Sequence, residues 1–475
     1  MVTQYTNIFI VGIKGVAMAN IARILVQLGK NVSGSDVVEE FITDHELQGI
    51  QIFSSFEAQV LPPETDLVIY SAAHGGENNK QVQEAIKRNI TVIHQAEFIG
   101  KLLTFYHISV AVSGCHGKTT TSSLIAYALK KLGVKPGFLV GVSEFNGIPG
   151  GDLGKNDYFV FEADEYAMNP PLDKTPKFHH FQPSHALVTN IDFDHPDVFS
   201  GIEETKKAFE KFLKQVKTPT EPLHPHIVLC VEDVHVKKVA SSLIRDTYIT
   251  YGFSSEADVI VSQVTKEGEG MKFKVESSLL KINDEFTISL FGEKNVLNAV
   301  GAICILRLFD FSLSQIQIAI ESFTGAKRRF EFIYCKNGTY LFDDYAHHPQ
   351  EIEATIQAAR IRFPERRVVV IFQPHTFTRT QSMQHEFIQA LSKADVSIIA
   401  PIFGSARESV AAQTVTSVDL ELLSHKKNIE NIKGYNSKED LMFSLPEHIQ
   451  KKDIIFTMGA GDIYKLAEEI KKLIH

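Results

Sequence analysis

A short segment around position 117 has the composition of a phosphate-binding loop. The motif Gly114-Cys-His-Gly-Lys-Thr-Thr120 stands between an apolar segment, 107–113, and a helical pattern. Glycines let backbone N–H groups approach phosphate oxygens, and the helix N-terminus adds positive potential. We expect Lys118 to contact the β- and γ-phosphates and the Thr119 hydroxyl to contact Mg²⁺. The motif has two residues between its glycines where the standard loop has four, and the alternative is a plain glycine turn before Lys-Thr.

Acidic and histidine side chains follow the next two predicted strands, 158–161 and 186–189. Glu162 opens the segment Glu-Ala-Asp-Glu, and His195 closes the segment Asn-Ile-Asp-Phe-Asp-His. The carboxyl ends of parallel strands meet at one edge of a sheet, so both side chains should lie beside the phosphate loop. Carboxylate and imidazole groups there suit a Mg²⁺ site. Asp164 and Glu165 fit solvated surface acids equally well, and His195 alone would be typical of a turn or a helix cap.

A second glycine turn lies near the N-terminus, between the predicted strand 7–11 and a helix. Gly12 and Gly15, with Asp36 about 20 residues further on, imitate a dinucleotide fingerprint but lack its full Gly-x-Gly-x-x-Gly form. The turn still suits a diphosphate, and Asp36 can accept a hydrogen bond from a hydroxyl. Ser71 follows another strand, 66–70. The alternative is a turn that only packs the helix on the strand.

Two polar clusters follow neighbouring strands near the C-terminus. One is the segment 343–349, Asp-Asp-Tyr-Ala-His-His-Pro, and the other is 373–379, Gln-Pro-His-Thr-Phe-Thr-Arg. The guanidinium of Arg379 can bind a carboxylate with two parallel hydrogen bonds, which a lysine cannot do. Together the clusters indicate a substrate-binding mouth, although either alone would often be a solvated loop.

The positions of these motifs indicate a chain built of several α/β domains. Strands alternate with helices in 1–106, restart at 107 and restart again near 327, so we expect domains at 1–106, 107–326 and 327–475. Each should be built on a mainly parallel sheet. A chain of 475 residues is too long for one hydrophobic core, which agrees with three domains.

The amino-acid composition is typical of a folded enzyme and argues against a nucleic-acid-binding or membrane protein. Apolar residues make up 44% and charged residues 22%, as in a folded enzyme, and the net charge of −9 gives no reason to bind nucleic acid. The four cysteines show no metal-ligand spacing, and we find neither a signal peptide nor about 18 consecutive apolar residues. We therefore expect a cytoplasmic protein with reduced thiols that does not enter membranes, as a monomer or weak homodimer.

Taken in order, the motifs resemble the Mur ligase family over nearly the whole chain. The resemblance rests on 114–120, Glu162-Ala-Asp-Glu, Thr189 to His195, Lys327-Arg-Arg-Phe-Glu, Asp344-Tyr-Ala-His-His-Pro and Met458-Gly-Ala-Gly-Asp. It implies an N-terminal Rossmann-like UDP-sugar domain, a central P-loop ATPase domain and a C-terminal Rossmann-like domain. It also implies ATP and Mg²⁺ as cofactors, and a two-step reaction in which ATP phosphorylates a muramoyl carboxylate and an amine attacks the acyl phosphate.

The resemblance also assigns roles by motif position. Lys118, Glu162 and His195 would be catalytic, and Thr119, Glu162 and His195 would serve the metal. The nucleotide site would comprise Gly114, Cys115, His116, Gly117, Lys118, Thr119, Thr120, Asn295, Arg329 and Asp344. The UDP-sugar would meet Gly12, Gly15, Asp36 and Ser71. The incoming amino acid would meet Tyr345, His347, His375 and Arg379.

The third-domain motifs are similar to those of the family branch that adds L-alanine to UDP-N-acetylmuramate. Three features depart from these patterns: Lys294 stands where the family usually has histidine, Thr376 stands where many members of that branch have arginine, and the segment 166–183 is longer than in that branch. The last feature is similar to the branch that attaches the murein tripeptide L-Ala-γ-D-Glu-meso-diaminopimelate, which is the alternative. Two other classes are an NAD-linked oxidoreductase, which leaves the phosphate loop unexplained, and an inactive UDP-sugar-binding protein.

Overall fold

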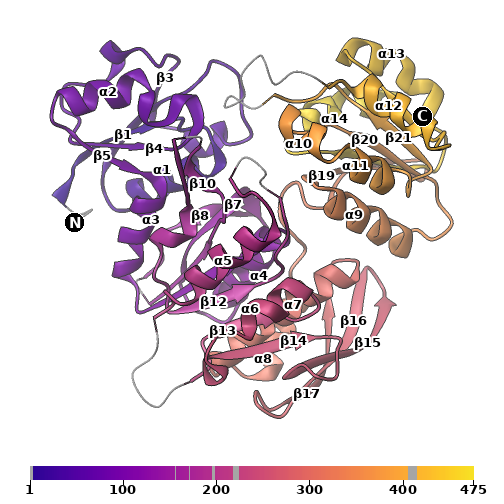
Figure 1. The fold of residues 1–475 in the computed structure, drawn as a ribbon, viewed down its shortest axis with the longest axis horizontal. Helices are drawn as coiled ribbons and strands as arrows, with labels where there is room; N and C mark the ends of the chain where they lie inside the picture. The colour runs from indigo at the N-terminus through magenta and orange to yellow at the C-terminus, as the bar shows by residue number, and fades with distance from the viewer. Residues whose placement is uncertain are drawn as a thin grey trace. The chain divides into compact units, whose positions relative to one another are not determined.

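The chain forms three α/β domains, each built on its own mainly parallel sheet (Figure 1). The computed structural model describes residues 4–155, 157–170, 172–194, 198–217, 224–404 and 415–474. The first two domains pack into one unit, residues 1–265, 272–289 and 295–326, here called the first unit. The second unit comprises 266–271, 290–294 and 327–475. The expected fold class is confirmed, and the exact domain boundaries stay a prediction.

The N-terminal sheet has five parallel strands in the order β3-β2-β1-β4-β5. Its central strands are apolar and buried on both faces, as a parallel sheet covered by helices requires. Because the strand order reverses at β1, the carboxyl ends of β1 and β4 flank a crevice suited to a ligand. The elements are β1 (Asn7–Val11), α1 (Val16–Gln27), β2 (Asn31–Ser35), β3 (Gln51–Phe53), β4 (Leu67–Tyr70), α2 (Lys80–Lys87), β5 (Thr91–His94) and α3 (Gln95–Leu102).

The central domain is built on a ten-stranded sheet in the order β17-β16-β15-β14-β13-β12-β6-β9-β7-β8. The strands β14-β13-β12-β6-β9-β7 are parallel neighbours, so their carboxyl ends share one edge. The strands are β6 (Ile108–Ser113), β7 (Gly137–Phe145), β8 (Ile148–Asp152), β9 (Tyr158–Glu162), β12 (His185–Val188), β13 (Ile227–Cys230), β14 (Tyr248–Gly252), β15 (Val259–Glu267), β16 (Gly270–Ser277) and β17 (Ile282–Ile288).

Helices and one small hairpin complete the central domain. They are α4 (Lys118–Lys131), β10 (Ala167–Asn169), β11 (Asp173–Pro176), α5 (Ile202–Leu213), α6 (Val234–Ala240), α7 (Glu293–Leu308) and α8 (Leu313–Glu321). The side chains of α4 are buried from Thr119 to Leu129, because the helix lies inside the domain. Within the described parts of the chain, no helix has both the length and the apolar composition needed to cross a bilayer.

The third domain has a six-stranded sheet in the order β18-β19-β23-β20-β21-β22, parallel except for the β18–β19 hairpin. Its strands are β18 (Glu331–Lys336), β19 (Thr339–Asp344), β20 (Val368–Phe372), β21 (Val396–Ile399), β22 (Ile432–Gly434) and β23 (Ile454–Met458). Its helices are α9 (Pro349–Arg362), α10 (Phe377–Ser382), α11 (Gln384–Leu391), α12 (Ser417–Lys426), α13 (Lys438–His448) and α14 (Ala467–Leu473).

The strands that the sequence predicted are present. The strand 7–11 has the predicted bounds, and the strands predicted at 66–70, 158–161 and 186–189 differ by one residue at one or both ends. Strands β13 to β17 were not predicted. In β15 to β17 burial largely alternates from one residue to the next, so these strands lack the continuous apolar run that marks a fully covered strand.

A buried arginine joins the strand ends of the third domain. The Nε of Arg328 donates to Oδ2 of Asp343 (2.8 Å), and its Nη groups donate to the carbonyls of Gly459 (2.6 Å) and Gly461 (3.3 Å). Its guanidinium also lies 4.5 Å from the ring centroid of Tyr464. Only the planar fork of arginine can satisfy these acceptors together.

Replacing Arg328 with alanine should lower the free energy of unfolding of the second unit by roughly 3–5 kcal/mol, because Asp343 stays buried without its partner. Urea unfolding followed by circular dichroism measures this. The neighbouring Lys327 pairs with Glu331 near the surface (2.7 Å), and Lys327→Ala should cost about 1 kcal/mol or less. Equal losses for the two variants would contradict the assignment of Arg328.

Candidate active site

The segment between β6 and α4 has the backbone of a phosphate loop. Gly114 and Gly117 adopt φ values of 131° and 83°, in the left-handed region that favours glycine. A Cβ on Gly114 would lie 2.2 Å from Oγ1 of Thr189, and one on Gly117 would lie 2.6 Å from Oδ1 of Asn298. The loop therefore needs both glycines, for conformation and for space.

Side chains that follow β12 hold the loop in place. The His116 amide donates to Oδ1 of Asn190 (2.9 Å), and the His116 carbonyl accepts from Nδ2 of Asn190 (2.8 Å) and Oγ1 of Thr189 (2.6 Å). The Cys115 thiol contacts the backbone of Asp192, and burial raises the thiol pKa well above its usual value. The polar segment after β12 thus shapes the loop, while Cys115 is kept as an unreactive thiol.

Lys118 begins α4 and its ammonium group is held in a buried acidic environment. Its Nζ donates to the Gly114 carbonyl (2.6 Å) and to Oε2 of Glu165 (3.1 Å), and lies 3.9 Å from Asp164. Burial lowers the pKa of Lys118, but the surrounding carboxylates, Glu165 first, outweigh burial and raise it overall. Lys118 is therefore a fixed positive charge beside the loop.

Of the two alternatives left open for Glu165, a site residue or a solvated surface acid, its burial contradicts the second. Its residue exposure is 1%, whereas the side chain of Asp164 keeps 41% of its exposure. A buried carboxylate needs a partner, and Lys118 supplies it.

Glu162 ends β9, and its carboxylate accepts hydrogen bonds from residues of α4 and β7. Its Oε2 accepts from the Thr119 hydroxyl (3.2 Å), and its Oε1 accepts from the Gly141 amide (2.6 Å) and the Ser122 hydroxyl (3.4 Å). A hydroxyl and a carboxylate this close are hard oxygen donors of the kind that Mg²⁺ prefers, and Mg²⁺ commonly uses one or two carboxylates with water. Thr119 and Glu162 therefore fit a Mg²⁺ site. His195 lies outside the described residues, so its metal role stays a prediction.

The first unit also brings α7 to the loop. Nδ2 of Asn298 donates to Oδ1 of Asn295 (3.3 Å), and the Asn298 side chain packs against Gly117. Asn295 was predicted, and it lies one turn before this contact. Asn190, Asn298, Glu165 and Gly141 were not predicted as site residues. Asn190 and Glu165 stand inside the motifs 190–195 and 162–165, which was an available signal, but Gly141 meets Glu162 only through the sheet.

The carboxylate of Asp36 holds the N-terminal glycine turn in place by hydrogen bonding. One carboxylate oxygen accepts from the Lys14 amide (2.7 Å) and the other from the Val37 amide (2.8 Å), while His74 lies 3.7 Å away. Gly12 adopts a φ of 75°, and Gly15 precedes α1. The structure thus brings together the predicted turn and Asp36, whose residue exposure is only 2%.

Ser71 lies at the same strand-end edge of this sheet, directly after β4. It is buried, and its hydroxyl accepts from the Ala73 amide at 3.3 Å.

In the second unit, the carboxylate of Asp344 lies close enough to the guanidinium of Arg329 for their charges to interact. Burial raises the pKa of Asp344 to about 6, although Arg329 opposes this rise. The two Asp344 oxygens accept from the amides of Phe330 (2.9 Å) and Ala346 (2.8 Å). The guanidinium of Arg329 lies 5.1 Å from the Tyr345 ring centroid. Asp344 therefore anchors the segment that carries Tyr345.

The predicted amino-acid cluster is partly assembled within the second unit. The ring centroids of Tyr345 and His347 are 5.3 Å apart, and those of His347 and His375 are 6.3 Å apart. Arg379 is buried in α10, whose N-cap is Thr376. Thr376 adopts a φ of 68°, unusual for a β-branched residue, and backbone strain of this kind is common at binding sites.

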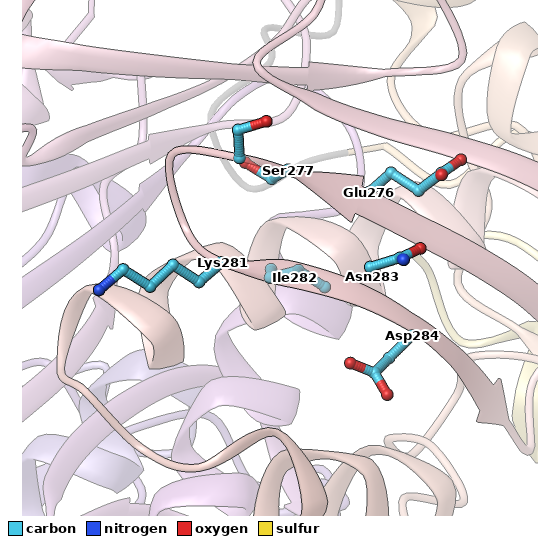
Figure 2. A pocket seen from close by; sticks show the side chains of 7 residues that line it. Glu276, Ser277, Lys281, Ile282, Asn283 and Asp284 are labelled. Carbon is cyan, nitrogen blue, oxygen red and sulfur yellow. The ribbon is translucent and has the colours of Figure 1, made fainter.

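A surface hollow lies at the turn between β16 and β17 in the first unit (Figure 2). It contains none of the predicted site residues. Its lining is polar and comprises Glu276, Ser277, Ser278, Lys281, Ile282, Asn283 and Asp284.

Replacing Gly117 with alanine should weaken binding of a Mg²⁺–nucleoside triphosphate at least about tenfold, since the left-handed backbone and the contact with Asn298 would both be strained. Isothermal titration with a non-hydrolysable ATP analogue measures the effect. Gly133 is a matched control at the other end of α4, because its φ is 82° but a Cβ would meet nothing within 4 Å. Gly133→Ala should cost stability and leave nucleotide binding unchanged. Equal weakening by both variants would contradict the loop assignment.

Comparison with known proteins gives the family. Residues 7–107 match the model "Mur ligase family, catalytic domain", 112–306 the "Mur ligase middle domain", and 328–461 the "Mur ligase, glutamate ligase domain". Curated proteins named UDP-N-acetylmuramate--L-alanine ligase are similar along their full length. The one from Desulfitobacterium hafniense is 34% identical over 470 residues, 98% of this chain and 99% of that protein. The one from Pelobacter propionicus is 34% identical over 477 residues, 100% of this chain and 99% of that protein.

Solved structures agree. The UDP-N-acetylmuramate-alanine ligase of Thermotoga maritima superposes with a TM-score of 0.79 at 25% identity, covering 98% of this chain and 99% of that chain. A murein peptide ligase from Psychrobacter arcticus shares the fold, with a TM-score of 0.73 at 23% identity over 98% of each chain. A phosphate loop of the family's type, three α/β domains and full-length relatives lead to one conclusion: this chain belongs to the Mur ligase family.

Proposed function

We propose that this protein uses ATP and Mg²⁺ to join L-alanine to UDP-N-acetylmuramate, a step that builds the peptide of a peptidoglycan precursor. The full-length relatives at 34% identity bear the name of this activity. The observation that carries the proposal is the phosphate loop, where a buried lysine and a carboxylate–hydroxyl pair stand at adjacent strand ends. An inactive binding protein would have no need to keep this arrangement.

The reaction has two steps. A carboxylate oxygen of the muramoyl group attacks the γ-phosphorus, the bond to the β-phosphate oxygen breaks, and ADP leaves. The amine of alanine then attacks the acyl carbon, loses a proton, and phosphate leaves as the amide bond forms. Such chemistry depends mainly on orientation and on neutralised phosphate charge.

The first unit would bind the nucleotide. The loop amides and Lys118 would hold the phosphates, and Asn295 would lie beside them at the start of α7. Thr119 and Glu162, with His195, would hold Mg²⁺, which when bound neutralises charge on the transferred group. Glu165 accepts a hydrogen bond from Lys118 and helps to raise the pKa of its ammonium group, which stays charged.

The substrates would lie at the other strand ends. The turn of Gly12 and Gly15, with Asp36 and Ser71, would bind the UDP-sugar in the first unit. In the second unit Arg329 and Asp344 would serve the nucleotide. The amino acid would meet Tyr345, His347, His375 and Arg379, whose guanidinium would bind its carboxylate.

Replacing Lys118 with alanine should reduce turnover by about 10²-fold or more, because a positive charge on the transferred phosphate is lost. ADP release with saturating substrates measures turnover. Binding of UDP-N-acetylmuramate, measured by titration, should stay within about twofold and would also show that the variant is folded. Unchanged turnover would refute the nucleotide assignment.

A competition experiment identifies the nucleophile. The protein, ATP, Mg²⁺ and UDP-N-acetylmuramate are offered L-alanine, glycine, L-serine and the murein tripeptide together, and the products are resolved by mass spectrometry. We expect the alanine adduct to dominate. A dominant tripeptide adduct would move the protein to the tripeptide branch, and no ADP release with any amine would refute the ligase function.

A further inference from the structure

The first helix of the N-terminal domain contacts the central domain through a buried asparagine. Asn20 lies in the middle of α1 and has 0% exposure. Its Nδ2 donates to the carbonyl oxygens of Val140 (2.9 Å) and Val142 (3.0 Å) in β7. These carbonyls flank Gly141, so the asparagine fixes the backbone on both sides of that residue.

One peptide group separates Asn20 from the candidate metal site. The Val140 carbonyl and the Gly141 amide belong to the same planar peptide bond, and in a trans peptide they point in opposite directions. The carbonyl accepts from Asn20, and the amide donates to Oε1 of Glu162 at 2.6 Å. A hydrogen bond to the carbonyl polarises the amide and orients the whole plane, which strengthens the bond to the carboxylate.

Glycines make this close approach possible. A Cβ on Gly141 would lie 2.9 Å from Oε2 of Glu162. In β8, a Cβ on Gly150 would lie 2.6 Å from Nδ2 of Asn20, and one on Gly151 would lie 2.6 Å from the Asn20 carbonyl oxygen. The hairpin therefore has space for α1 on one side and for the carboxylate on the other.

We infer that Asn20 is a positioning residue for Glu162, acting through the peptide bond between Val140 and Gly141. The inference rests on the proposed function, in which Glu162 binds Mg²⁺. Since α1 starts at the turn of Gly12 and Gly15, one helix supports the proposed UDP-sugar turn at its N-terminus and the proposed metal site at its middle.

The test compares two contacts of the same helix. Asn20→Ala removes both bonds to β7. Gln27→Ala removes another bond from α1 to the central domain, in which the Leu153 amide donates to Oε1 of Gln27 at 2.7 Å, away from Glu162. Electron paramagnetic resonance measures binding of Mn²⁺, as a probe for Mg²⁺, to the full chain with a non-hydrolysable ATP analogue. Steady-state assays at varied Mg²⁺ give kcat and KM.

Loss of a residue that supports a metal ligand typically weakens metal binding by about 10- to 100-fold. For Asn20→Ala we expect a Kd for Mn²⁺ raised at least about 10-fold, with kcat partly restored by high Mg²⁺ and UDP-N-acetylmuramate binding within about twofold. Gln27→Ala should leave all three values unchanged. A Kd for Mn²⁺ that is unchanged in Asn20→Ala, or raised equally in both variants, would overturn the inference.

Two further results separate the possible failures. If the unaltered protein binds no Mn²⁺ with the ATP analogue, the proposed function itself fails. If Asn20→Ala does not fold by circular dichroism, Asn20→Ser replaces it, because its shorter hydroxyl can donate at most one bond. A raised Kd for Mn²⁺ in the serine variant supports the positioning role, and an unchanged one refutes it.

Discussion

The placement of one carboxylate, Glu162, is the constraint on which the candidate site depends. Hydrogen-bond donors around a carboxylate orient its oxygens and so tune metal binding, and here the donors are Thr119 and Ser122 of α4 and the amide of Gly141 in β7. The parallel order β12-β6-β9-β7 brings these segments to one edge. Glycine at 141 then becomes a requirement, because a Cβ there would lie within 3.0 Å of both carboxylate oxygens.

The charged side chains around the phosphate loop, Lys118 and Glu165, lie at the same edge of the central sheet. Lys118 would be costly to bury alone, and Glu165 offsets that cost while keeping the ammonium group charged. Both belong to elements that enter the site from parallel strands, β6 and β9. A phosphate entering the loop would therefore meet a charge that is already oriented, so little reorganisation is needed when the transferred group becomes more negative.

In the second unit, a buried arginine and a buried aspartate hold the candidate substrate-binding loops in shape. Arg328 satisfies three backbone or carboxylate acceptors at once and ties the ends of β19 and β23 together. Asp344 ends β19 and accepts from the amides of Phe330 and Ala346, so it fixes the backbone directly after Tyr345 and ties it to the segment before β18. The substrate-facing side chains are thus carried by loops, while buried polar groups at the strand ends hold those loops in shape.

The sequence by itself determined the strands that are buried on both faces, such as 7–11, and the glycine loop of 114–120, because continuous apolar runs and glycine–lysine spacing are local signals. It also placed Glu162 and the cluster that contains Asp344 at strand ends. It did not predict β15 to β17, in which burial largely alternates from one residue to the next instead of forming a continuous apolar run, and it left open whether Glu165 is exposed. Only the tertiary structure decided that Glu165 faces Lys118, that Asn298 packs on Gly117, and that Asn20 reaches Glu162 through Gly141. Those contacts join residues far apart in sequence, and their partners are selected by strand order and helix packing, which no local pattern encodes.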